Sequence, residues 1–383
     1  MFFNKITLTA GFALFSMFFG SGNLIFPLNV GRESFSAYPY AIIGLCLTAV
    51  LVPILGFLGM VFAGGDRIAY FKKLGKYPTF FLTLLMLSLM GPFGVMPRCI
   101  GLSYGGLMLS FPNMPLWAFS AGFCIMTGLL IWQPNKVVSI IGVFLTPFKL
   151  GSLFLLIVAG LYFSPPTINA TVSTFETLSN GISQGYQTMD LLAAFFFGCT
   201  IVEFIRNRIK DKHGTIDMHK ALHHSFYAGL IGISLLGSAY AGFIALGASY
   251  ADQVMHVSAE SLLVTVSGLA LGPIAIPIVG FTICVSCLAT ATILAKLFAD
   301  FLHQDILQHK ITYHQSVIIT MVVCFIFSLL GFQMIVGMLA GFLSWLYPLL
   351  ILYAVYKIYD GIRNMKNTDT ILEKDKDNDA LSA

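Results

Sequence analysis

Long apolar runs, each about as long as the hydrocarbon core of a bilayer is thick, constrain this chain more than any other feature. A transmembrane helix needs about 20 consecutive apolar residues, and about ten stretches of the 383-residue sequence meet this condition. Only 10% of the residues are charged, whereas about a quarter of a typical soluble protein is charged. We therefore predict an all-α polytopic membrane protein. The expected spans cover residues 6–28, 38–63, 78–110, 115–133, 137–163, 187–206, 222–247, 273–302, 315–332 and 335–356.

The uneven distribution of basic residues between the loops predicts the orientation of the chain. Lysine and arginine accumulate on the cytoplasmic side of membrane proteins. Here they follow every second predicted span. Clusters that begin at Arg67, Arg206 and Lys357 follow spans two, six and ten, and the single residues Lys136 and Lys310 follow spans four and eight. The intervening loops carry almost none. Ten spans with both termini in the cytoplasm fit this pattern.

Two segments lie outside the series of spans. Residues 261–271 are apolar but too short to cross a bilayer. Because they end at Gly272-Pro273, we expect a helix that lies at one membrane face or dips into it. Residues 364–383 are polar and mixed in charge, a composition typical of disorder, and we expect a disordered cytoplasmic tail.

The stretch SMFFGSGNLIFP, residues 16–27, places weak helix formers at mid-membrane depth. Glycine costs about 1 kcal/mol relative to alanine inside a helix, and the run from Gly20 to Asn23 contains two glycines. Irregular backbone at this depth persists only where protein or a water-filled cavity satisfies its polar groups. The stretch is therefore either a close helix contact through small residues or a break in the first span.

A similar stretch five spans later favours the break. Span six contains FFFGCT, residues 195–200, which resembles FFGS at residues 18–21. Since five is odd, a repeated five-span unit must be inserted upside down the second time, as in many secondary transporters with discontinuous helices. We predict a five-plus-five inverted repeat with spans one and six discontinuous. One transmembrane domain would cover 1–363, with repeats at about 1–163 and 185–356.

Five motifs resemble those of one family. The segment GFALFSMFFGSGNLIFPLNVG, residues 11–31, resembles the first-span signature of bacterial branched-chain amino acid carriers, the leucine-isoleucine-valine cation symporters. GPFGVMPR (91–98), GYQTMD (185–190), SCLATA (286–291) and LYP (346–348) resemble further family motifs in the expected order. The resemblance implies a LeuT-like fold, a bacterial cell membrane, import of leucine, isoleucine and valine, and no cofactor besides a coupling sodium ion or proton. Family members usually carry twelve spans, whereas ten are predicted here. The resemblance therefore does not imply oligomerisation through the last pair.

The two breaks predict where a free amino acid binds. After the first break, a half-helix would offer unpaired N–H groups and a positive dipole end to the carboxylate. Before the second break, free carbonyl groups would accept the ammonium group. Phenylalanines beside both breaks would surround an apolar side chain, with ordinary packing as the alternative for each. The candidate substrate-binding residues are Phe19, Gly20, Ser21, Gly22 and Asn23 in span one and Phe196, Phe197, Gly198, Cys199 and Thr200 in span six.

Ionisable residues inside spans are costly and are functional candidates by default. Arg98 in span three and Asp190 in span six both lie toward the outer side. They are predicted to pair as an outer gate over the substrate, or else to form a static salt bridge or be exposed at the membrane interface.

Lys149 in span five is the most informative of the intramembrane charges. It lies about twelve residues into the predicted span, near the midplane, and a buried lysine readily changes its protonation state. The LeuT-like resemblance implies a sodium site between span one and hydroxyl groups of span eight, here Ser286 and Thr290. In some proton-coupled relatives of that fold, a span-five lysine takes the place of sodium. Lys149 is thus predicted to supply or replace the coupling cation, or else to be held by helix-end carbonyl groups without a role in transport.

Other functions remain as alternatives. An intramembrane enzyme would need a nucleophile with a base, or a metal cluster, at membrane depth, and the sequence contains neither HExxH nor GxSxG. No enzyme activity, no nucleic-acid partner and no metal other than sodium is expected. A channel would call for charged rings or repeated filter carbonyls from several copies. A LeuT-like transporter or exchanger for another small amino acid or amine is the alternative within transport.

Overall fold

The computed structural model describes residues 4–132, 146–169, 172–209 and 218–381, and within these ranges the side chains of all residues except 68, 146–150, 218–219 and 365–381. Every regular element in this part of the chain is helical. The first half contains α1 (Lys5–Phe18), α2 (Gly22–Ser34), α3 (Tyr38–Cys46), α4 (Val52–Phe62), α5 (Arg67–Phe71), α6 (Lys76–Met90), α7 (Val95–Met108), α8 (Leu116–Trp132) and α10 (Thr146–Tyr162). The second half contains α11 (Thr174–Gln187), α12 (Asp190–Ile209), α13 (Met218–Ser249), α14 (Ala251–Val254), α15 (Leu262–Leu271), α16 (Ala275–Phe301), α17 (Tyr313–Ser328) and α18 (Phe332–Leu381).

Length and composition identify the helices that can cross a membrane. In the described chain, five helical stretches pass this test: Gly22–Phe62, Lys76–Met108, Lys220–Ser249, Ala275–Ile306 and Phe332–Asn364. The pair α11 and α12 passes it together, across a bend of 42°. Shorter apolar helices include α1, α8 and α17. The predicted all-α membrane fold is confirmed, whereas the number of ten spans and the inverted repeat stay predictions.

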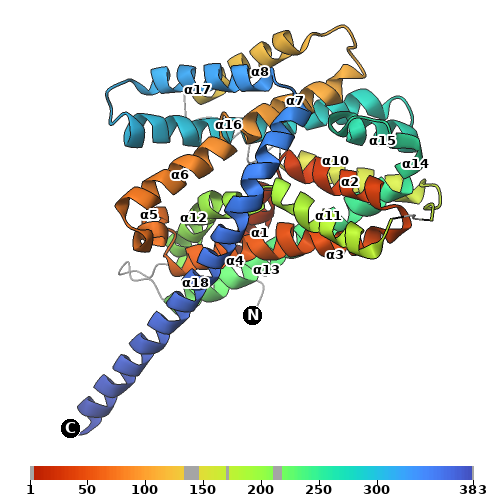
Figure 1. The fold of residues 1–383 in the computed structure, drawn as a ribbon. Helices are drawn as coiled ribbons and strands as arrows, with labels where there is room; N and C mark the ends of the chain where they lie inside the picture. The colour runs from red at the N-terminus through yellow and green to blue at the C-terminus, as the bar shows by residue number, and fades with distance from the viewer. Residues whose placement is uncertain (1–3, 133–145, 170–171, 210–217, 382–383) are drawn as a thin grey trace.

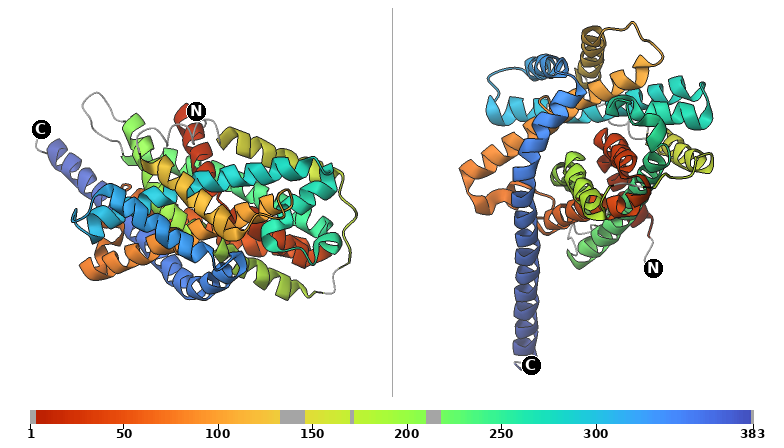
Figure 2. Two further views of the ribbon diagram at one scale, coloured as in Figure 1. Left: turned by 90° about the horizontal axis from the view of Figure 1, so that it is seen from above. Right: turned by 45° about the vertical axis from the view of Figure 1, so that its right-hand side comes forward.

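The helices that carry the two predicted breaks lie together near the middle of the molecule (Figures 1 and 2). Helix α13 packs along both α1 and α2, α12 packs against α1 and α4, and α16 packs against α7. Helices α8 and α17 pack on each other at one edge, and α18 crosses the body and extends beyond it (Figure 1). The elements that flank the breaks are therefore surrounded by other helices.

Glycines allow α2 and α13 to approach until their backbones touch. A Cβ atom on Gly31 would lie 2.0 Å from the carbonyl oxygen of Ile244, and one on Gly247 would lie 2.1 Å from that of Leu28. No larger residue fits at either position without displacing backbone. Small residues permit this kind of close crossing between membrane helices, and it fixes the half-helix after the first break against α13.

Four aromatic residues fix α5, the short helix that precedes α6, and we call them the α5 cluster. Tyr70, Phe71 and Phe195 are buried, and Tyr353 is half-buried. The Phe71 ring stacks on Tyr353 with centroids 5.6 Å apart and meets Phe195 edge-on at 5.5 Å. The Tyr353 hydroxyl donates a hydrogen bond to the Tyr70 carbonyl oxygen over 2.7 Å. The cluster thus joins α5 to α12 and α18.

Two expectations about short segments have different outcomes. Residues 262–271 form the separate helix α15, which ends at Gly272 with φ of +87°, as predicted for a short helix stopped by Gly-Pro. Helix α18 continues to Leu381, and the expected disorder of residues 364–383 stays a prediction.

Candidate functional site

The first predicted break is present between α1 and α2. Helix α1 ends at Phe18, Phe19 to Ser21 are not helical, and α2 begins at Gly22. The break is therefore slightly earlier than predicted, since Gly22 and Asn23 already form the first turn of α2. The N–H groups of this turn have no carbonyl partner within their own helix, so they can bind an anionic group.

The second break lies at Thr188-Met189, between α11 and α12. The prediction of a break within Phe196–Thr200 is wrong, because these residues belong to the uninterrupted helix α12. Met189 has φ of +60°, a conformation that side-chain-bearing residues seldom adopt. The chain turns here because tertiary contacts hold both helix ends, not because a glycine weakens the helix.

Asn23, Asp190 and Tyr240 connect the two breaks, and we call them the bridging network. The Asn23 amide group donates to both carboxylate oxygens of Asp190 at 2.9 Å and contacts the Tyr240 hydroxyl oxygen. The Tyr240 hydroxyl donates to Asp190 Oδ2 over 2.5 Å. Asn23 Oδ1 accepts from the Gly20 N–H at 2.9 Å. All three side chains are at most 1% exposed, so a buried polar network joins α2, α12 and α13.

Arg98 lies at the second break but does not pair with Asp190. Its Nη2 donates to the Gln187 carbonyl oxygen over 2.9 Å, and its guanidinium group lies 4.7 Å from the centre of the Phe26 ring. Within the described chain, the only ion pair with N–O below 4.0 Å joins Lys73 and Asp360. Arg98 and Asp190 therefore form no direct ion pair in this structure, and their role as an outer gate stays a prediction. The physical reason is that each charge is stabilised at a helix end, Arg98 at the negative end of α11 and Asp190 at the positive end of α12.

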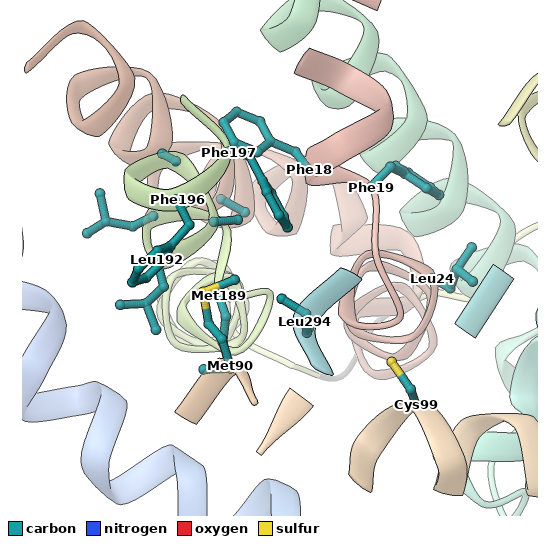
Figure 3. Close-up of a cluster of buried hydrophobic side chains, with 14 of the residues drawn as sticks. Phe18, Phe19, Leu24, Met90, Cys99, Met189, Leu192, Phe196, Phe197 and Leu294 are labelled. Atoms are coloured by element: carbon teal, nitrogen blue, oxygen red, sulfur yellow. The ribbon is translucent and has the colours of Figure 1, made fainter. Parts of the chain in front are cut away.

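Buried phenylalanines border the space between α1 and α12. Phe18, Phe19, Phe196 and Phe197 are each at most 8% exposed, and Figure 3 shows Phe18 and Phe197 directed toward the same space. Phe19 instead stacks toward Phe243 of α13 at 6.3 Å. The Arg67 guanidinium group lies 5.5 Å from the centre of the Phe196 ring. The role of these rings as walls of a substrate pocket therefore stays a prediction.

The last three candidates in span six do not face the break. A Cβ atom on Gly198 would meet Phe57 at 3.2 Å, and Cys199 contacts Met60, so both residues pack against α4. Thr200 is exposed. Because α12 is helical here, these residues point in directions set by the helix and not toward a loop of free carbonyl groups.

The candidate cation residues of span eight lie beside the first break. A Cβ atom on Gly20 would lie 3.7 Å from the Thr290 methyl carbon. The Thr290 hydroxyl donates to the Ser286 carbonyl oxygen one turn earlier, over 3.2 Å, and Ser286 is buried. Lys149 falls among the residues whose side chains the structure does not describe.

The sequence matches one protein family over nearly its whole length. Residues 3–372 match the family described as branched-chain amino acid transport protein. The chain belongs to this family. A relative from Staphylococcus saprophyticus, named as a branched-chain amino acid carrier, is 30% identical over 91% of this chain and 80% of its own length. A second relative, from Staphylococcus epidermidis and named likewise, is 29% identical with the same coverage.

Solved structures support a LeuT-like fold for this branched-chain amino acid transport family member. The inward-facing conformation of Mhp1 aligns with a TM-score of 0.60 and 15% identity, over 92% of this chain and 75% of Mhp1. MhsT in complex with L-phenylalanine aligns with a TM-score of 0.50 and 17% identity, over 85% of this chain and 79% of MhsT. Several apolar helices and the family together make the chain a multi-pass membrane protein.

Four of the five motifs of this branched-chain amino acid transport protein meet at the second break. The first-span motif supplies Asn23, GPFGVMPR supplies Arg98, GYQTMD supplies Asp190, and LYP supplies Tyr347, which is fully buried with its ring 4.8 Å from Tyr186. Sequence reasoning missed Tyr240 and Gln187. The GYQTMD motif held a signal for Gln187, whereas Tyr240 lies in an ordinary apolar helix without any local signal.

Proposed function

We propose that this protein imports leucine, isoleucine and valine by alternating access, coupled to a cation gradient. The observation that carries the proposal is the bridging network, which joins two interrupted spans inside a family of branched-chain amino acid transporters. Binding sites of LeuT-like transporters lie where discontinuous helices meet near the midplane. In the proposed orientation both termini lie in the cytoplasm, in agreement with the distribution of basic residues in the loops.

The substrate is proposed to bind between the two breaks. Its carboxylate would face the free N–H groups of Ser21, Gly22 and Asn23, because the start of α2 is electropositive. Its aliphatic side chain would lie against Phe18, at the first break, and against Phe197 of α12, both of which are buried. An apolar pocket discriminates one methylene by only about 1–3 kcal/mol, so the three branched-chain amino acids are expected to compete.

Purified protein in liposomes tests this function. We expect accumulation of labelled leucine when a sodium or a proton gradient is imposed, and competition by isoleucine and valine within about 100-fold of leucine, since each differs from it by a methylene or a branch. Each gradient is applied separately, and liposomes without protein are the control. Counterflow that responds to a different amino acid or an amine, but not to leucine, would contradict the substrate assignment. Equilibration without accumulation in either gradient would contradict symport.

The coupling cation is proposed to bind between the first break and α16. Gly20 and Thr290 lie side by side, and the carbonyl groups of the break together with the Ser286 and Thr290 hydroxyls are oxygen ligands of the kind that sodium accepts. Lys149 is proposed to supply or replace the cation here, because a desolvated lysine binds and releases a proton more easily than one in water.

Lys149→Ala is expected to abolish accumulation of leucine while counterflow persists, since the coupling charge is removed and the substrate site is kept. The measurement is uptake against pH from 5.5 to 8.5 in the wild type and the variant, in each gradient. Lys310→Ala, which removes an exposed loop lysine, is the matched control. If the variant accumulates leucine with an unchanged pH profile, Lys149 has no part in coupling.

A further inference from the structure

Two opposite charges are buried close to the proposed substrate position without forming an ion pair with each other. Arg98 and Asp190 are each 1% exposed. Their direct contacts are neutral groups: the Gln187 carbonyl and Met189 sulfur for Arg98, and the Asn23 amide and Tyr240 hydroxyl for Asp190. The helix ends beside them supply only partial charges, and a buried full charge without a countercharge is costly, so this arrangement calls for a partner that carries both charges.

Arg98 and Asp190 lie against two consecutive residues of the first turn of α2, Gly22 and Asn23. A Cβ atom on Gly22 would lie 2.9 Å from Arg98 Nη2, which places the guanidinium group directly against the start of α2. The next residue, Asn23, binds both carboxylate oxygens of Asp190. A positive and a negative group thus flank one helical turn, and the backbone N–H groups of that turn add to the positive side.

The positive side also retains unused hydrogen-bonding capacity. The N–H donor at Arg98 Nε is buried without a hydrogen-bond partner in the part of the chain that the structure describes. Buried polar atoms are nearly always paired, and a guanidinium group is well suited to a carboxylate because its N–H donors match the two oxygens. An unpaired, buried guanidinium donor therefore indicates an anionic group that binds next to α2.

We propose that Arg98 and Asp190 recognise the two ends of a zwitterionic α-amino acid, Arg98 the carboxylate and Asp190 the ammonium group. This inference rests on the proposed function and extends it. The charged ends of the substrate replace the missing ion pair, and a ligand that lacks either end leaves one buried charge uncompensated. The substrate class is then the free α-amino acid, and the corresponding amines and carboxylic acids are excluded although their apolar parts are the same.

The test compares leucine with two analogues that each lack one charged group. Binding of labelled leucine to purified protein is competed with leucine, with 3-methylbutylamine, which lacks the carboxylate, and with 4-methylpentanoate, which lacks the ammonium group. In the wild type, both analogues are expected to bind at least about 100-fold more weakly than leucine, as for loss of one partner of a buried charge pair.

Each variant is expected to lose one discrimination selectively. Arg98→Gln should weaken leucine binding by about 100-fold but 3-methylbutylamine by less than about threefold, so that the ratio between these two ligands collapses. Asp190→Asn should likewise weaken leucine binding by about 100-fold but 4-methylpentanoate binding by less than about threefold. Arg208→Gln and Asp252→Asn, which change exposed residues, are the matched controls and should leave both ratios unchanged.

The ratios separate recognition from a structural role. If Arg98→Gln weakens the binding of leucine and of the amine by the same factor, the assignment of Arg98 is wrong. If Asp190→Asn weakens the binding of leucine and of the acid by the same factor, the assignment of Asp190 is wrong.

If Arg98→Gln does not fold, Gly22→Ala displaces the guanidinium group while keeping its charge. This variant must lower the ratio of leucine affinity to amine affinity. Should the wild type bind another α-amino acid in place of leucine, only the proposed substrate is wrong, and the ratios are measured with that acid and its analogues. Should it bind no α-amino acid, both proposals fail.

Discussion

Asn23→Ala is expected to lower the initial rate of leucine uptake by at least about 100-fold. The substitution removes the amide group that donates to both oxygens of Asp190 and accepts from the Gly20 N–H. A hydrogen bond to a charged group contributes about 1.5–3 kcal/mol, and about 1.4 kcal/mol corresponds to a factor of ten. The variant therefore loses both the geometry of the first break and the link to the second.

The measurement is initial uptake of labelled leucine in liposomes at equal amounts of folded protein. Asn29→Ala is the control on the same helix, because Asn29 donates to Glu33 over 2.8 Å, two turns away from the break. Asn29 Oδ1 also accepts a hydrogen bond from Arg32. Loss of these two half-buried contacts, which lie away from both breaks, should reduce uptake by less than about tenfold. If Asn23→Ala transports within threefold of the wild type, the bridging network does not hold the site together. Asn23→Asp separates shape from charge, because it keeps the size of the side chain but places a second carboxylate beside Asp190.

The first break could be predicted from sequence because its cause is local. Gly20 and the small residues after it weaken a helix wherever they occur, so their position in an apolar run was sufficient. The exact residues differed slightly, since α2 resumes at Gly22. Helix ends are the part of a structure that sequence determines least well.

The second break was misplaced because its cause is not local. FFFGCT resembles the first-span sequence, but Gly198 lies inside the continuous helix α12, which packs on α4 at this point. The real break at Met189 contains no glycine. It is stabilised by Arg98, which lies 91 residues earlier and donates to Gln187 next to the turn. A pattern of helix propensity carries no information about such a contact.

The bridging network shows the same limit for the candidate site. Asn23 and Asp190 were both identified, one as a weak helix former and one as an intramembrane charge, but no sequence pattern placed them in contact. Their shared partner Tyr240 is 217 residues from Asn23. The close crossing of α2 and α13 at Gly31 and Gly247 brings Tyr240 to the break, and that crossing depends on the tertiary structure.

Phe71→Ala is expected to destabilise the protein by about 3–5 kcal/mol, the range for removing a large buried aromatic side chain. Phe71 is 2% exposed and contacts Tyr70, Phe195 and Tyr353 in the α5 cluster. The truncation leaves a cavity between α5, α12 and α18 that the surrounding helices can close only in part. The measurement is thermal denaturation of the detergent-purified protein, followed by the loss of monodisperse material. The consequence for transport should be indirect, because Phe195 lies on the same helix as Asp190 but five residues further along.

Lys73→Ala provides the matched control in the same region. Lys73 forms an ion pair with Asp360 over 2.5 Å, but its side chain is 47% exposed. The hydrogen bond to Asp360 raises the pKa of Lys73, so Lys73 stays protonated at neutral pH. An exposed pair nevertheless contributes little to stability, because water screens it. The two variants should therefore differ clearly in melting temperature. If they are equally stable, ion pairing and not aromatic packing holds α5 against α18, and the α5 cluster has been assigned the wrong role. Transport by Lys73→Ala should match the wild type, since Lys73 touches neither break.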